Sequence, residues 1–335
     1  MDKKGKAALK TLMLWTGLVG ALSTANAQTI CAFDLGGASG DNFAVMKDYV
    51  LAAKNWGVNI TLKPYGNEAA ALRDFKAGQC DGLVATSFIT RNFNSYTGSI
   101  NAIGAIPSNA IARNLLTLMG NPKVAGDMVD GDYEAAGIIP LGSAYLTTKD
   151  RNINTLAKIE GKRIGVLEVD PVQRRMAHKV GAKPVLMTID NAGNKFQTGQ
   201  IDILPAPSMG FTPLEIYRSM GANGGVARFP LSFMTLNFII KKDAYPAGYG
   251  QKSRTWFASQ VPRFMNKIVR DDASVPAKYW FDIPSEDQVG YLRILRQMRI
   301  EFVQNKTYNP KMMSLLKRLR CQQDATNYEC GLKDE

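Results

Sequence analysis

The stretch that decides the fold is Phe75-Lys76-Ala77-Gly78-Gln79-Cys80-Asp81, which returns 121 residues later as Phe196-Gln197-Thr198-Gly199-Gln200-Ile201-Asp202. Both copies extend to the pattern F-x-x-G-Q-x-D-x-x-x-A-x-S, with Ala85 and Ser87 in the first and Ala206 and Ser208 in the second. Upstream, a second set of residues matches at an offset of 124: Gly57, Leu62 and Asn67 correspond to Gly181, Leu186 and Asn191. The sequence therefore contains a duplicated unit whose helix is one turn shorter in the second copy.

Each copy reads as a strand, a short helix, a glycine that ends the helix, and an aspartate that caps the turn into the next strand. The repeat period is much longer than the roughly 20–50 residues of solenoid repeats. The duplication therefore predicts two similar α/β lobes.

The segments around the two copies complete this picture. Strands are predicted at residues 29–35, 58–62 and 82–86, and helices follow the glycine-rich turn 36–40, up to about Trp56, and at 67–77. This alternation favours a parallel sheet with right-handed crossovers. An extended segment at 135–146, a linker helix at 150–160 and a strand at 161–166 lead into the second lobe, and a strand at 231–241 returns to the first.

Two strands that cross between lobes form the hinge of a clamshell. We therefore predict lobe 1 at residues 28–140, lobe 2 at 141–231, and the hinge return strand with C-terminal helices at 232–335. The candidate helices are 253–269, 286–304 and 310–320, packed beneath both lobes. Arg293, Arg296 and Arg299 recur at helical spacing opposite apolar residues and are expected on the solvent face of their helix.

Residues 1–27 read as a cleaved signal peptide. Four lysines precede a short apolar run at 11–22, and Ala25-Asn26-Ala27 is an A-x-A cleavage site. The apolar run is shorter than the ~20 residues that cross a bilayer, so a membrane anchor is the weaker alternative. No later stretch is long and uncharged enough to span a membrane, and the mature chain is expected in the periplasm as a monomer.

Export makes disulfides possible. Four cysteines allow three pairings, of which we favour Cys31–Cys80 and Cys321–Cys330. The first would join the starts of two strands, and the second would close a short loop and hold the polar C-terminal tail. No C-x-x-C occurs and His178 is the sole histidine, so neither a metal nor a cofactor is expected.

The chain is basic, with a formal charge of +12. Removal of the signal peptide takes away four lysines and one aspartate and leaves +9. The basic residues are scattered among acids, without a nucleic-acid-binding module, so nucleic acid is not an expected partner. The sequence also lacks G-x-S-x-G, P-loop and H-E-x-x-H motifs, and an enzyme is not expected.

Residues 145–184 carry a family resemblance. Ile153-Asn154-Thr155, then Ile159-Glu160-Gly161-Lys162-Arg163-Ile164-Gly165-Val166, then Val180-Gly181-Ala182-Lys183-Pro184-Val185 resemble the pattern I-x-T-x-x-D-L-x-G-x-K-I-R-V … L-G-A-x-P-V of periplasmic solute-binding proteins of TRAP transporters. Residues 197–202 resemble the family's L-Q-x-G-x-V-D-G, and the resemblance covers nearly the whole mature chain.

This resemblance implies a type II periplasmic binding protein that captures a small molecule in an interlobe cleft and delivers it to an inner-membrane permease. The sequence is also similar to periplasmic proteins labelled as resistance-nodulation-division efflux components for aminoglycosides. An accessory role in drug efflux is therefore the alternative function.

The sequence departs from the family at two positions. Gly165 replaces the arginine that clamps a substrate carboxylate in the K-I-R-V strand, and the family's asparagine after V-D-G falls near Ala206. The ligand is thus uncharged, cationic, or an acid held by another basic group such as Arg91 or Arg174.

Ligands of open parallel sheets bind beyond the carboxyl ends of the strands, and this rule selects the candidate residues. In lobe 1 they are Phe33, Asp34, Ser39, Asp41, Tyr65, Asn67, Thr86, Ser87 and Arg91. In lobe 2 they are Glu168, Asp170, Arg174, Ala206 and Ser208, and on the return strand Phe233 and Asn237. Asp41 and Asp170 also fit helix caps, and Phe33 and Phe233 also fit the core.

Overall fold

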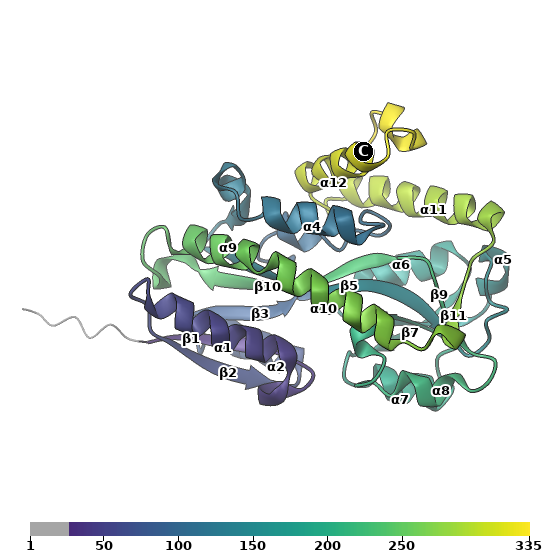
Figure 1. The fold of residues 1–335 in the computed structure, drawn as a ribbon, viewed down its shortest axis with the longest axis horizontal. Helices are drawn as coiled ribbons and strands as arrows, with labels where there is room; N and C mark the ends of the chain where they lie inside the picture. The colour runs from purple at the N-terminus through teal and green to yellow at the C-terminus, as the bar shows by residue number, and fades with distance from the viewer. Residues whose placement is uncertain (1–26) are drawn as a thin grey trace, which may run out of the picture.

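The computed structural model describes residues 27–335, so the predicted signal peptide lies outside the described residues except for Ala27. An 11-stranded sheet runs through two lobes with the main strand order β2-β1-β3-β10-β5-β8-β6-β7 (Figure 1). No helix of the described part is long and apolar enough to cross a membrane.

Lobe 1 is built on three parallel strands, with β1 between the other two. These strands are β1 (Gln28–Phe33), β2 (Ile60–Tyr65) and β3 (Gly82–Thr86). The helices of this lobe are α1 (Asp41–Lys54), α2 (Glu68–Lys76), α3 (Ser87–Thr90), α4 (Asn109–Leu118) and α9 (Tyr249–Ser259). The short strand β4 (Val129–Asp130) lies at the edge of β5.

The second strand begins two residues later than predicted. The Val58 N–H donates to the Ala53 carbonyl at 3.1 Å, and Gly57 has a φ of +80°, so Val58 belongs to the turn that ends α1. The strand then continues to Tyr65 because Pro64 and Tyr65 pair with the end of β1.

Lobe 2 repeats the parallel arrangement, with β6 between its neighbours. Its strands are β6 (Arg163–Leu167), β7 (Lys183–Met187), β8 (Ile203–Pro207), β9 (Gly225–Ala227) and β11 (Trp280–Phe281). Its helices are α5 (Leu156–Ile159), α6 (Pro171–Lys179), α7 (Ala192–Gln197) and α8 (Ile216–Met220).

The duplicated unit plays the same structural role in both lobes. Phe75 and Phe196 are both fully buried, and Gly78 and Gly199 both end a helix with a positive φ. The aspartate of each copy accepts a hydrogen bond at 2.8 Å from a backbone N–H at the start of the lobe's first strand: Asp81 from Thr29, and Asp202 from Arg163. The aspartate therefore holds the edge of the neighbouring strand, in addition to the turn that the sequence suggested.

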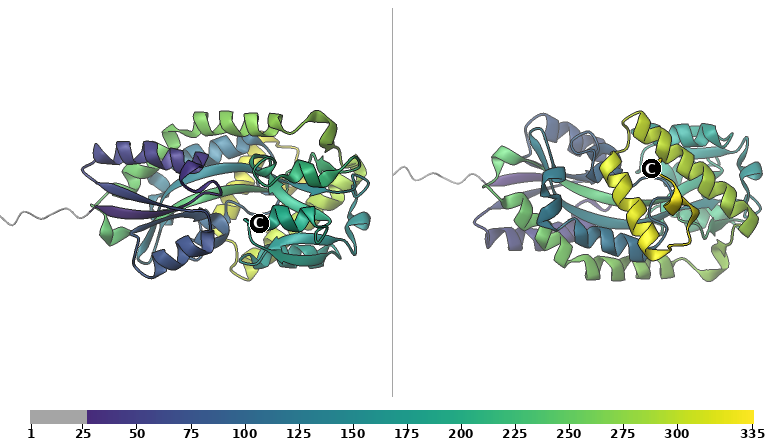
Figure 2. Two further views of the ribbon diagram at one scale, coloured as in Figure 1. Left: turned by 90° about the horizontal axis from the view of Figure 1, so that it is seen from below. Right: turned by 90° about the horizontal axis from the view of Figure 1, so that it is seen from above.

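Two long antiparallel strands, β5 (Tyr133–Thr148) and β10 (Ser232–Lys241), cross from one lobe to the other (Figure 2). From Ala144 onward β5 pairs with β8 of lobe 2 on its other side. The register between β5 and β10 shifts between Met234 and Thr235, next to Gly142, whose φ of +95° favours glycine. The lobe boundaries predicted at residues 140 and 231 remain a prediction, but this irregularity lies within a few residues of both.

The C-terminal helices join the lobes from the outside (Figure 1). They are α10 (Val261–Ser274), α11 (Ser285–Gln304) and α12 (Pro310–Gln323). Helix α11 packs against α5 of lobe 2, and α12 packs against α4 of lobe 1. The single helix predicted at 253–269 is two helices that meet at Gln260, because Pro262 lies in the first turn of α10 and supplies no N–H to a continuing helix.

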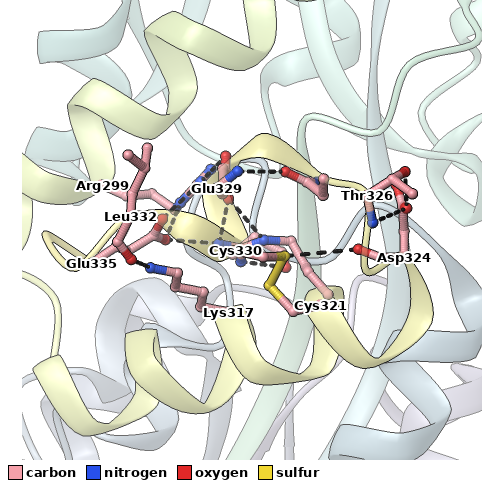
Figure 3. Close-up of a disulfide and its surroundings, with 12 residues drawn as sticks. Arg299, Lys317, Cys321, Asp324, Thr326, Glu329, Cys330, Leu332 and Glu335 are labelled. Carbon is pink, nitrogen blue, oxygen red and sulfur yellow. Dashed lines mark hydrogen bonds and ion pairs between the residues drawn. A yellow bond between two sulfur atoms is a disulfide. The ribbon is translucent and has the colours of Figure 1, made fainter.

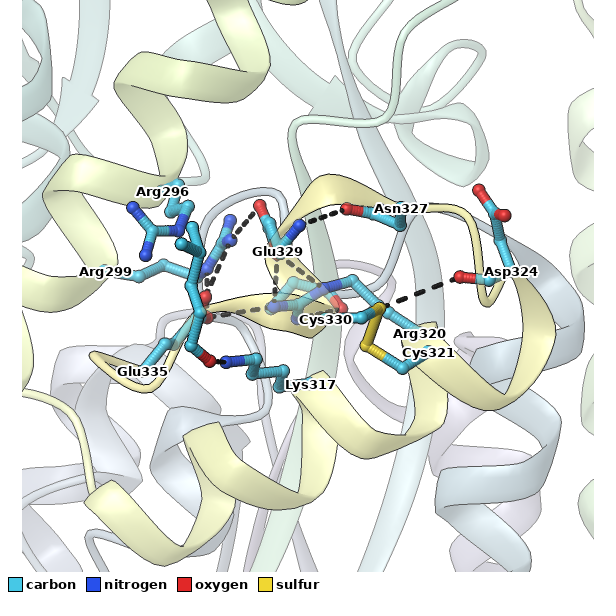
Figure 4. A network of polar contacts seen from close by, with 12 residues as sticks. Arg296, Arg299, Lys317, Arg320, Cys321, Asp324, Asn327, Glu329, Cys330 and Glu335 are labelled. Carbon is cyan, nitrogen blue, oxygen red and sulfur yellow. Dashed lines mark hydrogen bonds and ion pairs between the residues drawn. A yellow bond between two sulfur atoms is a disulfide. The ribbon is translucent and has the colours of Figure 1, made fainter.

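The arginine stripe predicted on the solvent face of α11 is only partly there. Arg293 is exposed, but Arg299 is 1 % exposed and binds Glu329 and Glu335. Arg320 of α12 binds the same two carboxylates (Figure 4). The prediction was wrong for Arg299, because the tail folds back over α11 and supplies the negative charge that makes burial of the guanidinium possible.

Both predicted disulfides are present. Cys31 of β1 bonds to Cys80, which directly precedes β3, and Cys321 of α12 bonds to Cys330. The second bond lies beside the arginine and glutamate cluster and fixes the segment that carries Glu329 (Figure 3).

Candidate functional site

Three neighbouring pockets lie between the lobes at the carboxyl ends of the parallel strands. We call them the main pocket, the turn pocket beside residues 34–42, and the side pocket beside α2; their empty volumes are about 820, 1250 and 380 Å³. Ile189 lines all three, and Met234 lines both the main and the turn pocket. They are therefore sections of one interlobe cleft.

The main pocket has apolar walls from both lobes. Lobe 1 contributes Phe88 and Ile103, and the crossing strands contribute Ala144 and Met234. Lobe 2 contributes most of the wall, including Val166, Leu167, Met176, Met187, Leu204 and Ala206. Gly165, at the place of the family's arginine, also lines this pocket, so the strand presents no charge here.

One end of the main pocket is polar. Arg91, which follows α3 of lobe 1, lies 3.4 Å from Asp170, which precedes α6 of lobe 2. The guanidinium also donates to the Asn101 Oδ1 at 2.8 Å and to the Gly98 carbonyl at 3.0 Å, and lies 5.4 Å from the ring centre of Tyr308. This cluster links the two lobes through a buried ion pair.

Asp170 is nearly inaccessible, with 1 % of its side chain exposed. Burial raises its pKa above the ordinary value, and the charge of Arg91 opposes part of that rise. Asp170 also accepts the Val172 N–H at 3.1 Å. It is therefore a helix cap, as one interpretation of the sequence held, and at the same time the partner of Arg91.

Asn101 carries a buried side-chain donor beside the main pocket. A guanidinium has only donors, so the Asn101 atom that it contacts must be the oxygen. The Asn101 Nδ2 is buried and has no hydrogen-bond partner within residues 27–335, although Asn101 lines the main pocket. An unpartnered buried amide donor costs ~1–3 kcal/mol, which an acceptor on a bound molecule would offset. Sequence reasoning missed Asn101 because it lies in an irregular segment, not at a strand end.

Asp34 lines the turn pocket, and its carboxylate is hydrogen-bonded to the backbone. Its carboxylate accepts N–H groups from Gly36, Asn42 and Phe43 at 2.7–3.2 Å. A Cβ at Gly40 would lie 1.8 Å from the Asp34 Oδ1, so this close approach requires glycine. Asp34 ends β1 and holds the start of α1, which is why the strand stops at Phe33, two residues earlier than predicted.

Five other candidates also line the turn pocket: Phe33, Ser39, Asp41, Thr86 and Ser208. The Ser208 hydroxyl donates to Asp272 at 2.5 Å. The Thr86 Oγ1 is buried without a partner in the described chain, so a ligand atom could supply the hydrogen bond that this hydroxyl lacks.

The side pocket contains Asn67 and Glu168 among the candidates, together with Phe33. Asn67 caps α2 by accepting the Ala70 N–H at 3.0 Å. Glu68, which was not predicted, lies beside it and accepts the Thr86 N–H at 2.5 Å. Burial raises the pKa of Glu68 to about 7. Glutamates are common and usually solvated in the first turn of a helix, so the sequence did not indicate that Glu68 is buried.

The remaining candidates line none of these three pockets. Tyr65 donates to Asp74 at 2.5 Å, and Arg174 is exposed on α6. Phe233 and Asn237 are fully buried in the sheet, where Asn237 bonds to Thr90 and Thr235. Ser87 is also buried, and Arg91 does not line the main pocket but contacts its lining residues Asn101, Asp170 and Tyr308. The pockets lie at the edge of the sheet that the strand-end rule selects, but the rule did not indicate which side chains line them.

Comparisons with known proteins agree with this architecture. The family model "Solute-binding protein AdeT 1/2" matches residues 50–335. "Probable solute-binding protein AdeT1" of Acinetobacter baumannii is 46% identical over 303 residues, 90% of this chain and 100% of the relative. "Probable solute-binding protein AdeT2" of the same species is 38% identical over 235 residues, 70% of this chain and 99% of the relative.

Among solved structures, a TRAP periplasmic solute-binding protein from Desulfovibrio salexigens with bound orotic acid has a TM-score of 0.70 and 13% identity, over 88% of this chain and 99% of that one. A second one, from Anaerococcus prevotii with bound glucuronate, has a TM-score of 0.69 and 15% identity, over 89% and 99%. The predicted bilobal α/β fold of the type II binding proteins and the predicted resemblance to TRAP solute-binding proteins are thereby confirmed.

Proposed function

Because this chain belongs to the AdeT 1/2 family of solute-binding proteins, we propose that it captures a small molecule between its lobes in the periplasm and delivers it to an inner-membrane permease of the TRAP type. The observation that carries the proposal is the main pocket, whose walls come from lobe 1, lobe 2 and the two crossing strands. A molecule in this pocket touches both sides of the hinge.

Binding of this kind couples to lobe closure. A ligand that contacts both lobes favours the closed arrangement by its differential affinity for the two states. The crossing strands with their irregularity at Gly142 support a hinge of two rigid bodies. Micromolar affinity corresponds to about 8 kcal/mol, which the apolar walls and a few hydrogen bonds can supply.

We further propose that the protein binds without chemical conversion, as a monomer and without nucleic acid. The three pockets are lined, in the described chain, by no histidine or cysteine. His178 is exposed on α6, and all four cysteines form disulfides. Asp170 is held by Arg91 and by the helix N-terminus, which leaves it poorly placed to accept a proton from a substrate.

The test is a thermal-shift screen of metabolites and aminoglycosides, followed by small-angle scattering to detect closure. A ligand at 100 times its Kd should stabilise the protein by about 2.7 kcal/mol. Ala206→Leu, which fills the main pocket, should abolish the shift, whereas the exposed Ala77→Leu should preserve it.

Three results would overturn the proposal. They are the absence of any stabilising compound, stabilisation that Ala206→Leu leaves intact, and conversion of the bound compound that Asp170→Ala abolishes. Saturable aminoglycoside binding with lobe closure would instead favour the accessory role in drug efflux.

A further inference from the structure

We propose that the main pocket selects an uncharged, largely apolar molecule that carries a hydrogen-bond acceptor such as a carbonyl oxygen. Asp170 already gives Arg91 the carboxylate that a ligand would otherwise provide. This inference rests on the proposed function and specifies the ligand class of the same site.

The first argument is the charge balance of the pocket. Asp170 is its sole charged lining residue within residues 27–335, and Arg91 neutralises it from the other lobe. A ligand carboxylate would either enter without a cation or displace Asp170 from Arg91. The second route leaves a buried carboxylate unpaired, which costs several kcal/mol. A ligand cation gains nothing from Asp170 for the same reason.

The second argument is the way Arg91 is held. Its Nε donates to Gly98 and its two Nη groups donate to Asp170 and Asn101. The guanidinium also stacks near Tyr308 and is only 10 % exposed. Each of the three guanidinium nitrogens therefore already donates a hydrogen bond within the protein, and a ligand carboxylate would have to compete with these partners for the planar fork.

The third argument is the free donor. Asn101 keeps its Oδ1 on Arg91, and its main-chain carbonyl accepts the Ser232 hydroxyl at 2.6 Å. The first contact orients the side chain and the second holds the main chain, and Nδ2 has no partner within residues 27–335. A neutral amide N–H pairs well with a carbonyl or hydroxyl oxygen, and the apolar walls then cover the rest of the molecule.

The proposal is tested with three probes that share one ring: benzamide, benzoate and benzylamine. Their Kd values are measured by calorimetry at pH 7.5 on the chain from residue 28 onward. We expect benzamide to bind at least tenfold more tightly than either charged probe. Asn101→Ala should weaken benzamide at least tenfold.

Two variants of the ion pair should change the selectivity in opposite directions. Asp170→Asn keeps the helix cap and frees the charge of Arg91, so benzoate should gain at least tenfold relative to benzamide. Arg91→Gln leaves Asp170 uncompensated, so benzylamine should gain. Glu160→Gln removes an exposed acid of lobe 2 that lines none of the three pockets, and it should leave all ratios unchanged.

A wild-type preference for benzoate or benzylamine would overturn the proposal, and so would an unchanged selectivity in both ion-pair variants. Failure of all three probes to bind would also overturn it. The proposed function would survive each of these outcomes if a library compound still bound in the main pocket and closed the lobes.

Discussion

Asp81 and Thr29 are joined by two hydrogen bonds: the Thr29 N–H donates to the Asp81 carboxylate at 2.8 Å, and the Asp81 N–H donates to the Thr29 carbonyl at 2.7 Å. Asp202 and Arg163 repeat this pair in lobe 2, with the guanidinium as an additional donor. In each lobe, the aspartate of the duplicated sequence thus holds the start of the first strand through two hydrogen bonds.

Replacement of Asp81 by alanine should destabilise the protein. The change leaves the Thr29 N–H without its acceptor, which costs ~1–3 kcal/mol. Urea unfolding should therefore show a lower midpoint at unchanged slope. Asp132→Ala, at an exposed position, is the control. An equal effect of both substitutions would contradict the role of Asp81 in holding the first strand.

Glu68 should make stability depend on pH. Its pKa is raised from 4.5 to about 7 in the folded protein, so the unfolded chain binds fewer protons between these two values. Stability therefore falls as pH rises through this window, by up to about 3 kcal/mol. Glu68→Gln keeps an acceptor for the Thr86 N–H, and it should flatten this part of the profile and raise stability at pH 8.

Urea unfolding of wild type and Glu68→Gln at pH 5 and pH 8 measures this effect. Glu160→Gln, at an exposed position, is the control. Equal wild-type stability at pH 5 and pH 8, or a difference that Glu68→Gln leaves in place, would refute the assignment.

Arg299 and Arg293 offer a matched comparison on one helix. Arg299→Met leaves Glu329 and Glu335 to share Arg320, and loss of one partner of a buried pair costs ~3–5 kcal/mol. Arg293→Met changes an exposed residue and should stay within ~0.5 kcal/mol. Chemical denaturation measures both, and equal effects would show that the cluster does not stabilise the fold.

The disulfide Cys321–Cys330 should stabilise the segment that covers α11. It closes a loop with a sequence separation of 9, so its loss costs up to about 3 kcal/mol in the chain-entropy account. In the double variant C321A/C330A, hydrogen exchange should increase at Tyr328–Gly331 and stay unchanged in β1. Uniform exchange across the protein would mean that the bond acts on global stability alone.

The regular elements could be predicted because local patterns determine them. Strand β3 has the predicted bounds, and α2 follows its Asn67 cap and ends before Gly78. The burial and contacts of individual side chains could not be predicted, since they depend on partners far along the chain. Arg299 is buried because of residues 30 and 36 positions later, and Arg91 because of Asp170, 79 positions later.

The break between α9 and α10 is different, because the sequence did contain its signal. Pro262 lies inside the predicted helix 253–269, and a proline interrupts a helix unless it falls in the first turn. The periodicity of the apolar residues is continuous across Gln260, and this continuity hid the break.

The crossing of β5 and β10 has a consequence for how the gene can be divided. Lobe 1 needs β10, which the chain reaches only after completing the parallel strands of lobe 2, and β8 of lobe 2 pairs with the far end of a strand that begins in lobe 1. A fragment that stops before residue 232 would keep β5 but lack β10, the strand that pairs with both β3 of lobe 1 and β5. The two lobes therefore have to fold from one uninterrupted chain. An exchange of one lobe between homologues would have to replace β5 and β10 together, because the two strands pair along their length.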